Sequence, residues 1–149
     1  HSAFRFPRAW LAGTWDFSFS GLKTAVLYDV KKQKPGQPFT PDETPLDVAR
    51  VPDLAASFQA AIVDVLVGKA AAAAEQHKVT EIFVAGGVSA NQALKAEFDK
   101  RSPVPVRVPP LILCTANAAM MAAAGNFRYL AGQRDALDMD VLPNWRLTG

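Results

Sequence analysis

The sequence predicts an α/β domain in which helices flank a largely parallel sheet. Residues 82–85 and 104–108 have the apolar character of strands, and residues 54–74 carry apolar positions at helical spacings of three and four. The predicted order is strand, helix, helix, strand, helix, strand, helix. Right-handed crossovers would place the helices over the faces of such a sheet. With 149 residues, 50% of them hydrophobic, the chain is expected to form a single domain over residues 1–149.

A strand followed by a helix is predicted near the N-terminus. Trp15, Phe17 and Phe19 alternate with polar residues, which is the period-two pattern of a short strand. Ser20 can cap the following helix. The apolar residues of that helix fall on one face: Leu22, Ala25, Val26 and Val30. Residues 35–45 hold four prolines and a glycine, which predicts a surface loop.

The longest predicted helix begins at Leu54 and extends through an alanine-rich run to Ala74. Gly68 lies inside it and costs about 1 kcal/mol relative to alanine, so close packing is expected at this position. Residues 82–85 are continuously apolar, as expected of a parallel strand that is buried on both faces. The glycines that follow end this strand.

Two further helices are predicted in the C-terminal half. Ser89 or Asn91 can start the first of them, before the second strand. Thr115 or Asn117 can cap the last helix. Gly132 is expected to end it, because glycine favours the position just after a helix.

Charge and cysteine content narrow the class of protein. The formal net charge is +2, and the only run of basic residues is at Lys31, Lys32 and Lys34, so the stripe of a dedicated nucleic-acid binder is absent from the sequence. Cys114 is the single cysteine and cannot form an internal disulfide. A reduced thiol and a cytoplasmic location are therefore expected.

No membrane span and no leader are predicted. The most apolar stretch, residues 60–74, is broken by Asp64 and Lys69 and falls short of the roughly 18 uncharged residues that a span needs. A signal peptide is not recognisable before it. The chain opens at His1 and Ser2 without a methionine, which leads us to expect a fragment of a longer protein.

The turn at residues 84–91 is the most informative candidate site. A buried strand leads through Gly86 and Gly87 into the start of a helix. Glycines let a ligand approach the backbone, and the free amides of a helix start favour an anion such as phosphate. Asn91 adds an amide that can hydrogen-bond a ribose or a base. A tight strand-to-helix turn without a ligand is the alternative interpretation.

Two other helix starts are weaker candidates. Residues 17–24 bring Ser18, Ser20, a glycine and Lys23 to a strand end, where they could line an anion site or simply form a capped helix. Residues 113–122 begin a helix with small side chains, which close helix packing explains as well.

Metal and peptidase chemistry find little support in the sequence. The strong nitrogen or sulfur ligands are His1, His77 and Cys114, whose spacing does not resemble a zinc site. The chain has no His-Glu-x-x-His helix and no serine in an elbow turn, so a peptidase is disfavoured.

Five ordered motifs carry a family resemblance. They are residues 4–8 (FRFPR), 16–25 (DFSFSGLKTA), 55–59 (AASFQ), 85–91 (AGGVSAN) and 114–120 (CTANAAM). Together they resemble the TsaD family of tRNA adenosine threonylcarbamoyltransferases, which were once labelled O-sialoglycoprotein endopeptidases of the glycoprotease family. The resemblance covers nearly the whole chain.

The resemblance implies the second, C-terminal lobe of the actin, Hsp70 and sugar-kinase ATPase fold, in which two lobes close over a nucleotide. By this likeness Gly86, Gly87 and Asn91 contact the adenylate, whereas no role follows for Ser20 or Lys23. The implied reaction is acyl transfer of a threonylcarbamoyl group from its adenylate to the adenosine next to the tRNA anticodon. The protein would supply orientation and, through a bound metal, charge stabilisation.

Two departures from the family pattern affect the metal. The family places two metal-binding histidines in the first lobe, and its third ligand is the aspartate of a Cys-Thr-Asp-Asn-Ala-Ala segment, where this chain has Ala116. A methyl group cannot coordinate a cation. We therefore expect no metal site, no bound cofactor and no transferase activity in this chain alone. The full-length family implies iron or zinc, with threonylcarbamoyl-adenylate or ATP as ligand.

The implied partners are tRNA, a TsaB-like subunit and a TsaE-like ATPase. Removal of one lobe would also uncover apolar surface, which favours self-association of the fragment.

Two alternative functions stay open. One is another enzyme of the same ATPase fold, a carbamoyltransferase or a sugar kinase, which residues 17–24 disfavour. The other is a noncatalytic binding or assembly module, which Ala116 favours.

Overall fold

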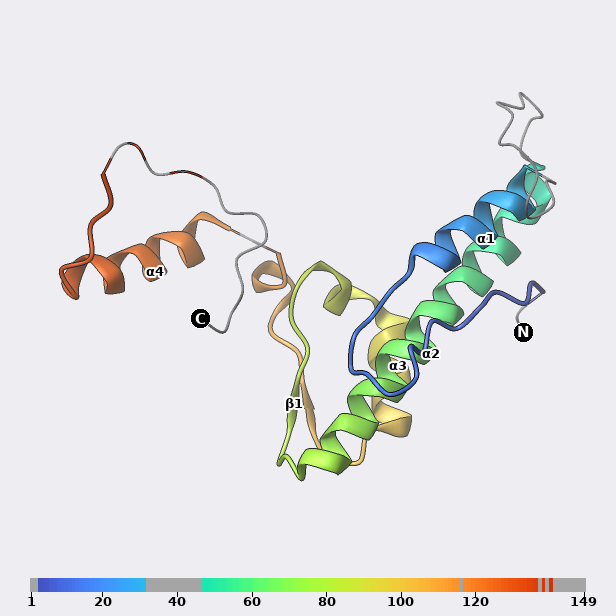
Figure 1. Cartoon of the computed structure of the whole chain (residues 1–149), viewed down its shortest axis with the longest axis horizontal. Coiled ribbons are helices and arrows are strands. Elements are labelled where there is room, and N and C mark those ends of the chain that lie inside the picture. The colour runs from blue at the N-terminus through green and yellow to red at the C-terminus, as the bar shows by residue number, and fades with distance from the viewer. Residues whose placement is uncertain (1–2, 32–46, 116, 137, 139, 141–149) are drawn as a thin grey trace. The chain divides into compact units, whose positions relative to one another are not determined.

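A computed structural model gives the fold of the chain and describes residues 3–31, 47–115, 117–136, 138 and 140 (Figure 1). The chain divides into two compact units, His1–Cys114 and Thr115–Gly149, and each is described by itself. The expectation of a single domain over residues 1–149 stays a prediction. The loop predicted at residues 35–45 lies outside the described residues.

The first unit is mostly helical in its described part. Its regular elements are the helices α1 (Ser20–Val30), α2 (Val51–His77) and α3 (Gln92–Arg101) and the strands β1 (Ile82–Phe83) and β2 (Val106–Arg107). Short 3₁₀ turns occupy Val48–Arg50, Gly87–Ala90 and Leu111–Leu113. The helices lie where the sequence predicts them, whereas the strands are shorter.

The two strands form a parallel pair joined through α3 (Figure 1). Ile82 lies opposite Val106 and Phe83 opposite Arg107. The backbone N–H of Ile82 donates to the carbonyl of Pro105 at 2.9 Å, which extends the ladder by one residue. This β-α-β crossover confirms the parallel arrangement that the sequence predicts, although on a smaller scale.

The prediction that β1 is buried on both faces is wrong for this chain. The side chain of Phe83 is 70% exposed. Ile82 and Val106 pack against the core that α2 and α3 form. Because successive side chains of a strand point to opposite faces, Phe83 faces away from that core.

The strand predicted at residues 15–19 is also wrong, since this segment has no strand structure. The ammonium of Lys69 donates to the carbonyl of Asp16 in this segment and, at 2.9 Å, to the carbonyl of Thr14 just before it. The same ammonium lies 5.5 Å from the ring centre of Phe17. Lys69 is buried, and these contacts fix the segment on α2.

The first core lies between α2, α3 and one face of the sheet. Its buried members are Val63, Val67, Leu94 and Phe98. Partly buried residues of both strands pack against them. Removing these side chains from water is the main stabilising contribution in this part of the fold.

Gly68 lies at a close contact, which confirms the expectation for it. A Cβ atom at this position would lie 2.5 Å from Cη2 of Trp10 and 3.0 Å from Nη2 of Arg101. The absence of a side chain therefore lets the indole of Trp10 rest directly on α2.

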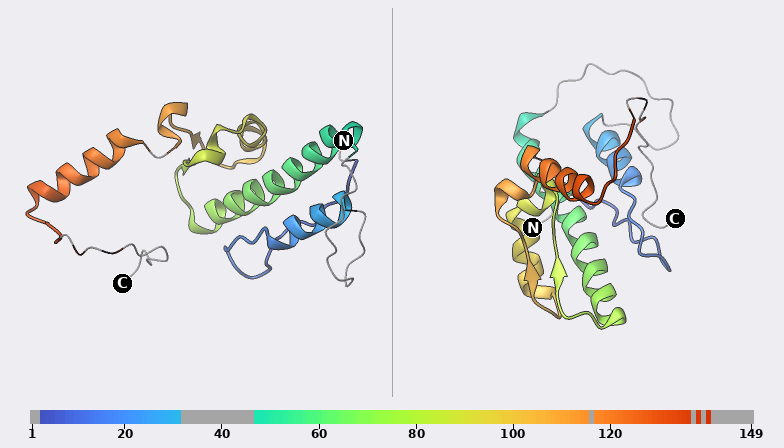
Figure 2. Two further views of the ribbon diagram at one scale, coloured as in Figure 1. Left: turned by 90° about the horizontal axis from the view of Figure 1, so that it is seen from above. Right: turned by 90° about the vertical axis from the view of Figure 1, so that its left-hand side faces the viewer.

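A second core joins α1 and the N-terminal segment to α2, and Figure 2 shows α1 alongside α2. Phe6, Leu22 and Ala61 are buried there. The hydroxyl of Ser57, which is fully buried, accepts a hydrogen bond from the backbone N–H of Phe4 at 3.2 Å. The first half of α2 is thereby fixed by packing and by a satisfied buried polar group.

Asp64 links three segments through two ion pairs. Its carboxylate lies 3.3 Å from Nε of Arg8 and 2.7 Å from Nη1 of Arg101. Partial burial raises the pKa of Asp64, but the hydrogen bonds from Arg101 and Arg8 outweigh it, so the pKa lies below its ordinary value. The N-terminal segment, α2 and α3 are thus joined electrostatically.

This network predicts acid sensitivity. A carboxyl group with a lowered pKa in the folded state stabilises that state above its unfolded pKa of about 3.9, and this stabilisation is lost as the pH falls through the lower folded value. We expect Asp64→Asn to lower the free energy of unfolding at neutral pH by about 0.5–1 kcal/mol, a range that allows for solvent screening. Urea denaturation between neutral pH and pH ~3 should show the difference from the unmodified chain shrinking toward acid.

Asp99→Asn is the matched control. Asp99 lies on α3 like Arg101, but no ion pair joins it to another residue that the structure describes. It should leave the stability and its pH dependence close to those of the unmodified chain. A difference between Asp64→Asn and the unmodified chain that grows as the pH falls would contradict the assignment.

The length and composition of α2 also fit a membrane span. The helical stretch Val48–His77 is long and apolar enough to cross a membrane, by length and composition only. The core helix of a soluble protein meets the same criterion. Here α2 contributes to both cores, and its Asp64 and Lys69 make the polar contacts described above. The apolar character of α2 is therefore explained by packing within the unit.

The second unit contains α4 (Ala118–Leu130). The side chain of Asn117 caps it by accepting from the N–H of Met120 at 3.0 Å, which confirms one of the two predicted caps. Gly132 follows the helix with φ +79°, the left-handed conformation expected of a C-terminal glycine. Large apolar side chains of α4 are exposed within this unit, among them Met121 and Phe127.

Candidate functional site

The turn after β1 has a conformation that requires glycine. Gly86 has φ 87° and ψ 173°, a region that residues with a Cβ essentially do not occupy. Gly87 begins the short 3₁₀ turn that leads toward α3. A Cβ atom built on either glycine meets nothing within 4 Å, so the space beside both backbones is open. A ligand can therefore approach this backbone closely.

Ser89 stabilises the turn through two hydrogen bonds to the carbonyl of Gly86. Its hydroxyl donates to the carbonyl of Gly86 at 2.6 Å, and its backbone N–H donates to the same oxygen at 3.0 Å. Ser89 is 5% exposed, so both bonds are shielded from water. The sequence suggests Ser89 as a helix start, but its side chain instead holds the bend that precedes the helix.

Asn91 is the residue that caps α3. Its Oδ1 accepts from the backbone N–H of Leu94 at 3.0 Å, and its Nδ2 donates to Oε1 of Gln59 at 2.9 Å. The predicted helix start at Asn91 is thus confirmed. The sequence did not point to Gln59 as a site residue. It lies, however, in the motif at residues 55–59, one of the segments that carry the family resemblance.

The second candidate segment lies beside the first. Phe17, Phe19 and Lys23 line one apolar cavity of about 600 Å³ together with Val88 and Ser89 of the glycine turn. The structure therefore brings these two predicted sites together. The role of each residue in binding stays a prediction.

The start of α1 differs from its prediction. Phe19, not Ser20, occupies the capping position, and no side chain there accepts a hydrogen bond from the helix. The hydroxyl of Ser20 instead pairs with that of Ser18 at 3.0 Å. The helix begins one residue earlier than a Ser20 cap requires, so the hydroxyl lies inside the first turn.

The third candidate segment, residues 113–122, crosses the division between the two units. Cys114 is buried, and its thiol lies 3.4 Å from the carbonyl oxygen of Pro109 and 3.6 Å from that of Pro110. Ala116 lies outside the described residues. Among the residues that are described, no group of three or more His, Cys, Asp or Glu side chains is arranged to hold a metal ion.

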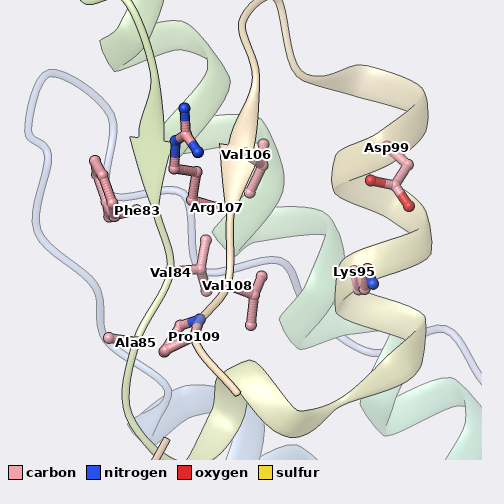
Figure 3. A pocket seen from close by; sticks show the side chains of 9 residues that line it. All are labelled: Phe83, Val84, Ala85, Lys95, Asp99, Val106, Arg107, Val108 and Pro109. Atoms are coloured by element: carbon pink, nitrogen blue, oxygen red, sulfur yellow. The ribbon is translucent and has the colours of Figure 1, made fainter. Parts of the chain in front are cut away.

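A further cavity of about 550 Å³ lies along β1, β2 and α3, and Figure 3 shows the side chains that line it. Lys95 and Asp99 reach it from α3, and Arg107 reaches it from β2. The hydrogen bond to Glu81 raises the pKa of the Arg107 guanidinium. Because Arg107 is already paired, it is not a free cation for a ligand.

Comparison with known proteins decides the family. A sequence profile described as "TsaD: tRNA N6-adenosine threonylcarbamoyltransferase" matches residues 1–123, most of the chain. The chain belongs to the TsaD family. This result confirms the resemblance carried by the five motifs, and TsaD membership implies the actin, Hsp70 and sugar-kinase ATPase fold.

Several bacterial TsaD proteins are similar to the chain, each named tRNA N6-adenosine threonylcarbamoyltransferase. The protein of Dehalococcoides mccartyi is 46% identical over 142 residues, which cover 95% of this chain and 40% of that protein. That of Thermomicrobium roseum is 49% identical over 148 residues, covering 93% and 40%. That of Bacillus subtilis is 44% identical over 148 residues, covering 95% and 40%. The chain therefore spans about 40% of the length of these TsaD relatives.

Proposed function

We propose that the chain is the C-terminal, nucleotide-binding lobe of a TsaD-type transferase. In the complete protein it would help to move a threonylcarbamoyl group from its adenylate to the adenosine next to the anticodon of tRNA. The open glycine bend at Gly86 and Gly87, inside a segment that matches the family, is the observation that carries this proposal. The coverage of about 40% of each relative fits one lobe of a two-lobe protein.

The glycine bend suits the adenylate part of this substrate. Backbone N–H groups at the bend and at the start of α3 favour a phosphate, since a helix start carries partial positive charge. Ser89 holds the bend from inside, so little ordering is needed when the ligand binds. Asn91 adds one amide donor at the start of α3. These residues would bind and orient the substrate so that its carbonyl carbon is exposed to the tRNA amine.

The residues of this chain do not fit the family's metal. Ala116 stands where the resemblance implies an aspartate ligand, and a methyl group offers no lone pair. We therefore assign no step of the reaction to a metal held by this chain. Its contribution would be to bind the leaving AMP and to hold the acyl group in position.

Partners follow from the same proposal. tRNA would be the acceptor, and TsaB-like and TsaE-like subunits would complete the assembly.

A noncatalytic binding module is the second candidate function, and Ala116 is the observation that favours it. Both candidates use the same lobe, so activity in a complete protein distinguishes them.

A chimera tests the proposed function. The N-terminal portion of the Bacillus subtilis relative, joined to this chain in place of its own matching segment, would be assayed for modification of tRNA with threonylcarbamoyl-adenylate. We expect the Ala116→Asp chimera to modify tRNA and the chimera with Ala116 to be at least about 100-fold slower, since a lost metal ligand removes several kcal/mol of charge stabilisation.

The relative itself serves as the positive control. Activity of the Ala116 chimera equal to that of the relative would overturn the assignment of the missing ligand. A folded Ala116→Asp chimera that binds tRNA without modifying it would favour the noncatalytic module.

A further inference from the structure

We propose that Gln59 is a positioning residue that orients the amide of Asn91, so that Asn91 presents a single N–H donor to an adenine nucleotide. This inference rests on the proposed function and adds a residue from α2 to the site. It also restricts the ligand chemistry. The atom that meets Asn91 must be a hydrogen-bond acceptor, such as a ribose oxygen, a ring nitrogen or a phosphate oxygen.

The α3 cap sets the first half of this orientation. The backbone N–H of Leu94 needs an acceptor, and Oδ1 of Asn91 lies 3.0 Å away. An amide has its oxygen on one side and its nitrogen on the other, so the cap turns Nδ2 away from the helix. Leu94 is buried in the first core, which holds this N–H group in place.

Gln59 sets the second half. Nδ2 of Asn91 lies 2.9 Å from Oε1 of Gln59, and it can only donate. One of its two hydrogens is used in this bond, and the other has no partner among the residues that the structure describes. The carboxamide is thus fixed by two bonds that act on its opposite ends, and one donor remains for a ligand.

The backbone of Gln59 is held firmly although its side chain is exposed. Ser57 and Ala61, two residues before and after it, are both fully buried. The hydroxyl of Ser57 accepts a hydrogen bond from the backbone N–H of Phe4, and Ala61 belongs to the second core. Gln59 therefore extends from a rigid part of α2 across to the start of α3.

The pairing is tested first without any ligand. In a ¹H–¹⁵N spectrum of the full chain, the two Nδ2 protons of Asn91 are expected at well-separated shifts, with the bonded proton downfield. Gln59→Met keeps the length and helix propensity of the side chain but removes the amide acceptor. It should move the bonded proton upfield, whereas Gln76→Met, an exposed control on the same helix, should leave it unchanged.

The functional role is tested with AMP as the probe. Asn91→Ser keeps a good helix cap but removes the amide. Gln59→Met and Asn91→Ser are each expected to weaken AMP binding about threefold to tenfold, as for one hydrogen bond. Because Gln59 acts through Asn91, the double variant should bind AMP no more weakly than Asn91→Ser alone. The free energies of unfolding, measured in urea, should not follow this pattern.

Each outcome has one meaning. An unchanged Asn91 Nδ2 signal in Gln59→Met overturns the pairing. A further loss of affinity when Gln59→Met is added to Asn91→Ser means that Gln59 contacts the ligand directly and overturns the positioning role. If the unmodified chain does not bind AMP at all, the proposed function fails and this inference with it, while the ligand-free spectrum still reports on the pairing.

Discussion

Replacing Phe98 by alanine is expected to lower the free energy of unfolding of the His1–Cys114 unit by about 3–5 kcal/mol, the range for removal of a buried aromatic ring. Phe98 is 4% exposed and belongs to the core between α2, α3 and the sheet. Val67 and Leu94 pack in the same cluster, so the deletion leaves a cavity that neighbours on two helices cannot fill. Urea denaturation followed by far-ultraviolet circular dichroism measures the loss.

Phe83→Ala is the matched control for this prediction. It removes the same ring from the same unit, but Phe83 is 70% exposed. Its loss should change the free energy of unfolding by no more than about 0.5 kcal/mol. Equal losses in the two variants would contradict the placement of the core on only one face of the sheet.

Replacing Gly86 by alanine is expected to destabilise the chain by about 1–3 kcal/mol, the cost of holding a Cβ-bearing residue in a conformation reserved for glycine. Gly86 has φ 87° and ψ 173°. The space beside it is open, so the backbone conformation and not a clash would cause the loss. Alternatively, the bend would relax and release the hydrogen bond from the Ser89 hydroxyl to the Gly86 carbonyl. Chemical denaturation measures the cost of either response.

Gly87→Ala is the matched control, because it adds the same methyl group to the bend without backbone strain. The φ of Gly87 lies outside the left-handed range and its surroundings are open, so alanine fits without strain. Its stability should therefore stay within about 0.5 kcal/mol of the unmodified chain. A loss as large as that of Gly86→Ala would show that the whole bend, and not Gly86 alone, depends on glycine.

The helices of this fold could be predicted from the sequence because their signals are local. Apolar residues at spacings of three and four predict α2, and the structure confirms the caps at Asn91 and Asn117. The contact at Gly68 was also predictable, since a glycine inside a long helix costs stability unless something packs there. Helix prediction needs little information about distant parts of the chain.

The strands were harder to predict because a strand depends on its partner. Alternating aromatic residues at 15–19 suggest a strand, yet Lys69, more than 50 positions along the chain, binds the carbonyl of Asp16 and that of the preceding Thr14. The strand β1 was likewise predicted to be buried on both faces, although the described elements cover only one of its faces. No local pattern shows whether such a partner is present.

The candidate site could be predicted in part. Paired glycines between a strand and a helix indicate an open turn, and the positive φ of Gly86 agrees with that indication. Ser89 and Gln59 were not predicted in their present roles, because their contacts depend on the turn and on the packing of α2 against α3. The contact of Gly86, Gly87 and Asn91 with a nucleotide stays a prediction.

The central claim is that the Gly86–Gly87 bend and Asn91 form half of a cradle for an adenine nucleotide. Titration of the full chain with AMP, followed residue by residue in ¹H–¹⁵N spectra, tests it most directly. We predict saturable shifts centred on the amides of Gly86, Gly87 and Asn91, with a dissociation constant on the order of 1 mM for a single lobe. Saturable shifts centred elsewhere, or none at millimolar AMP, would contradict the claim.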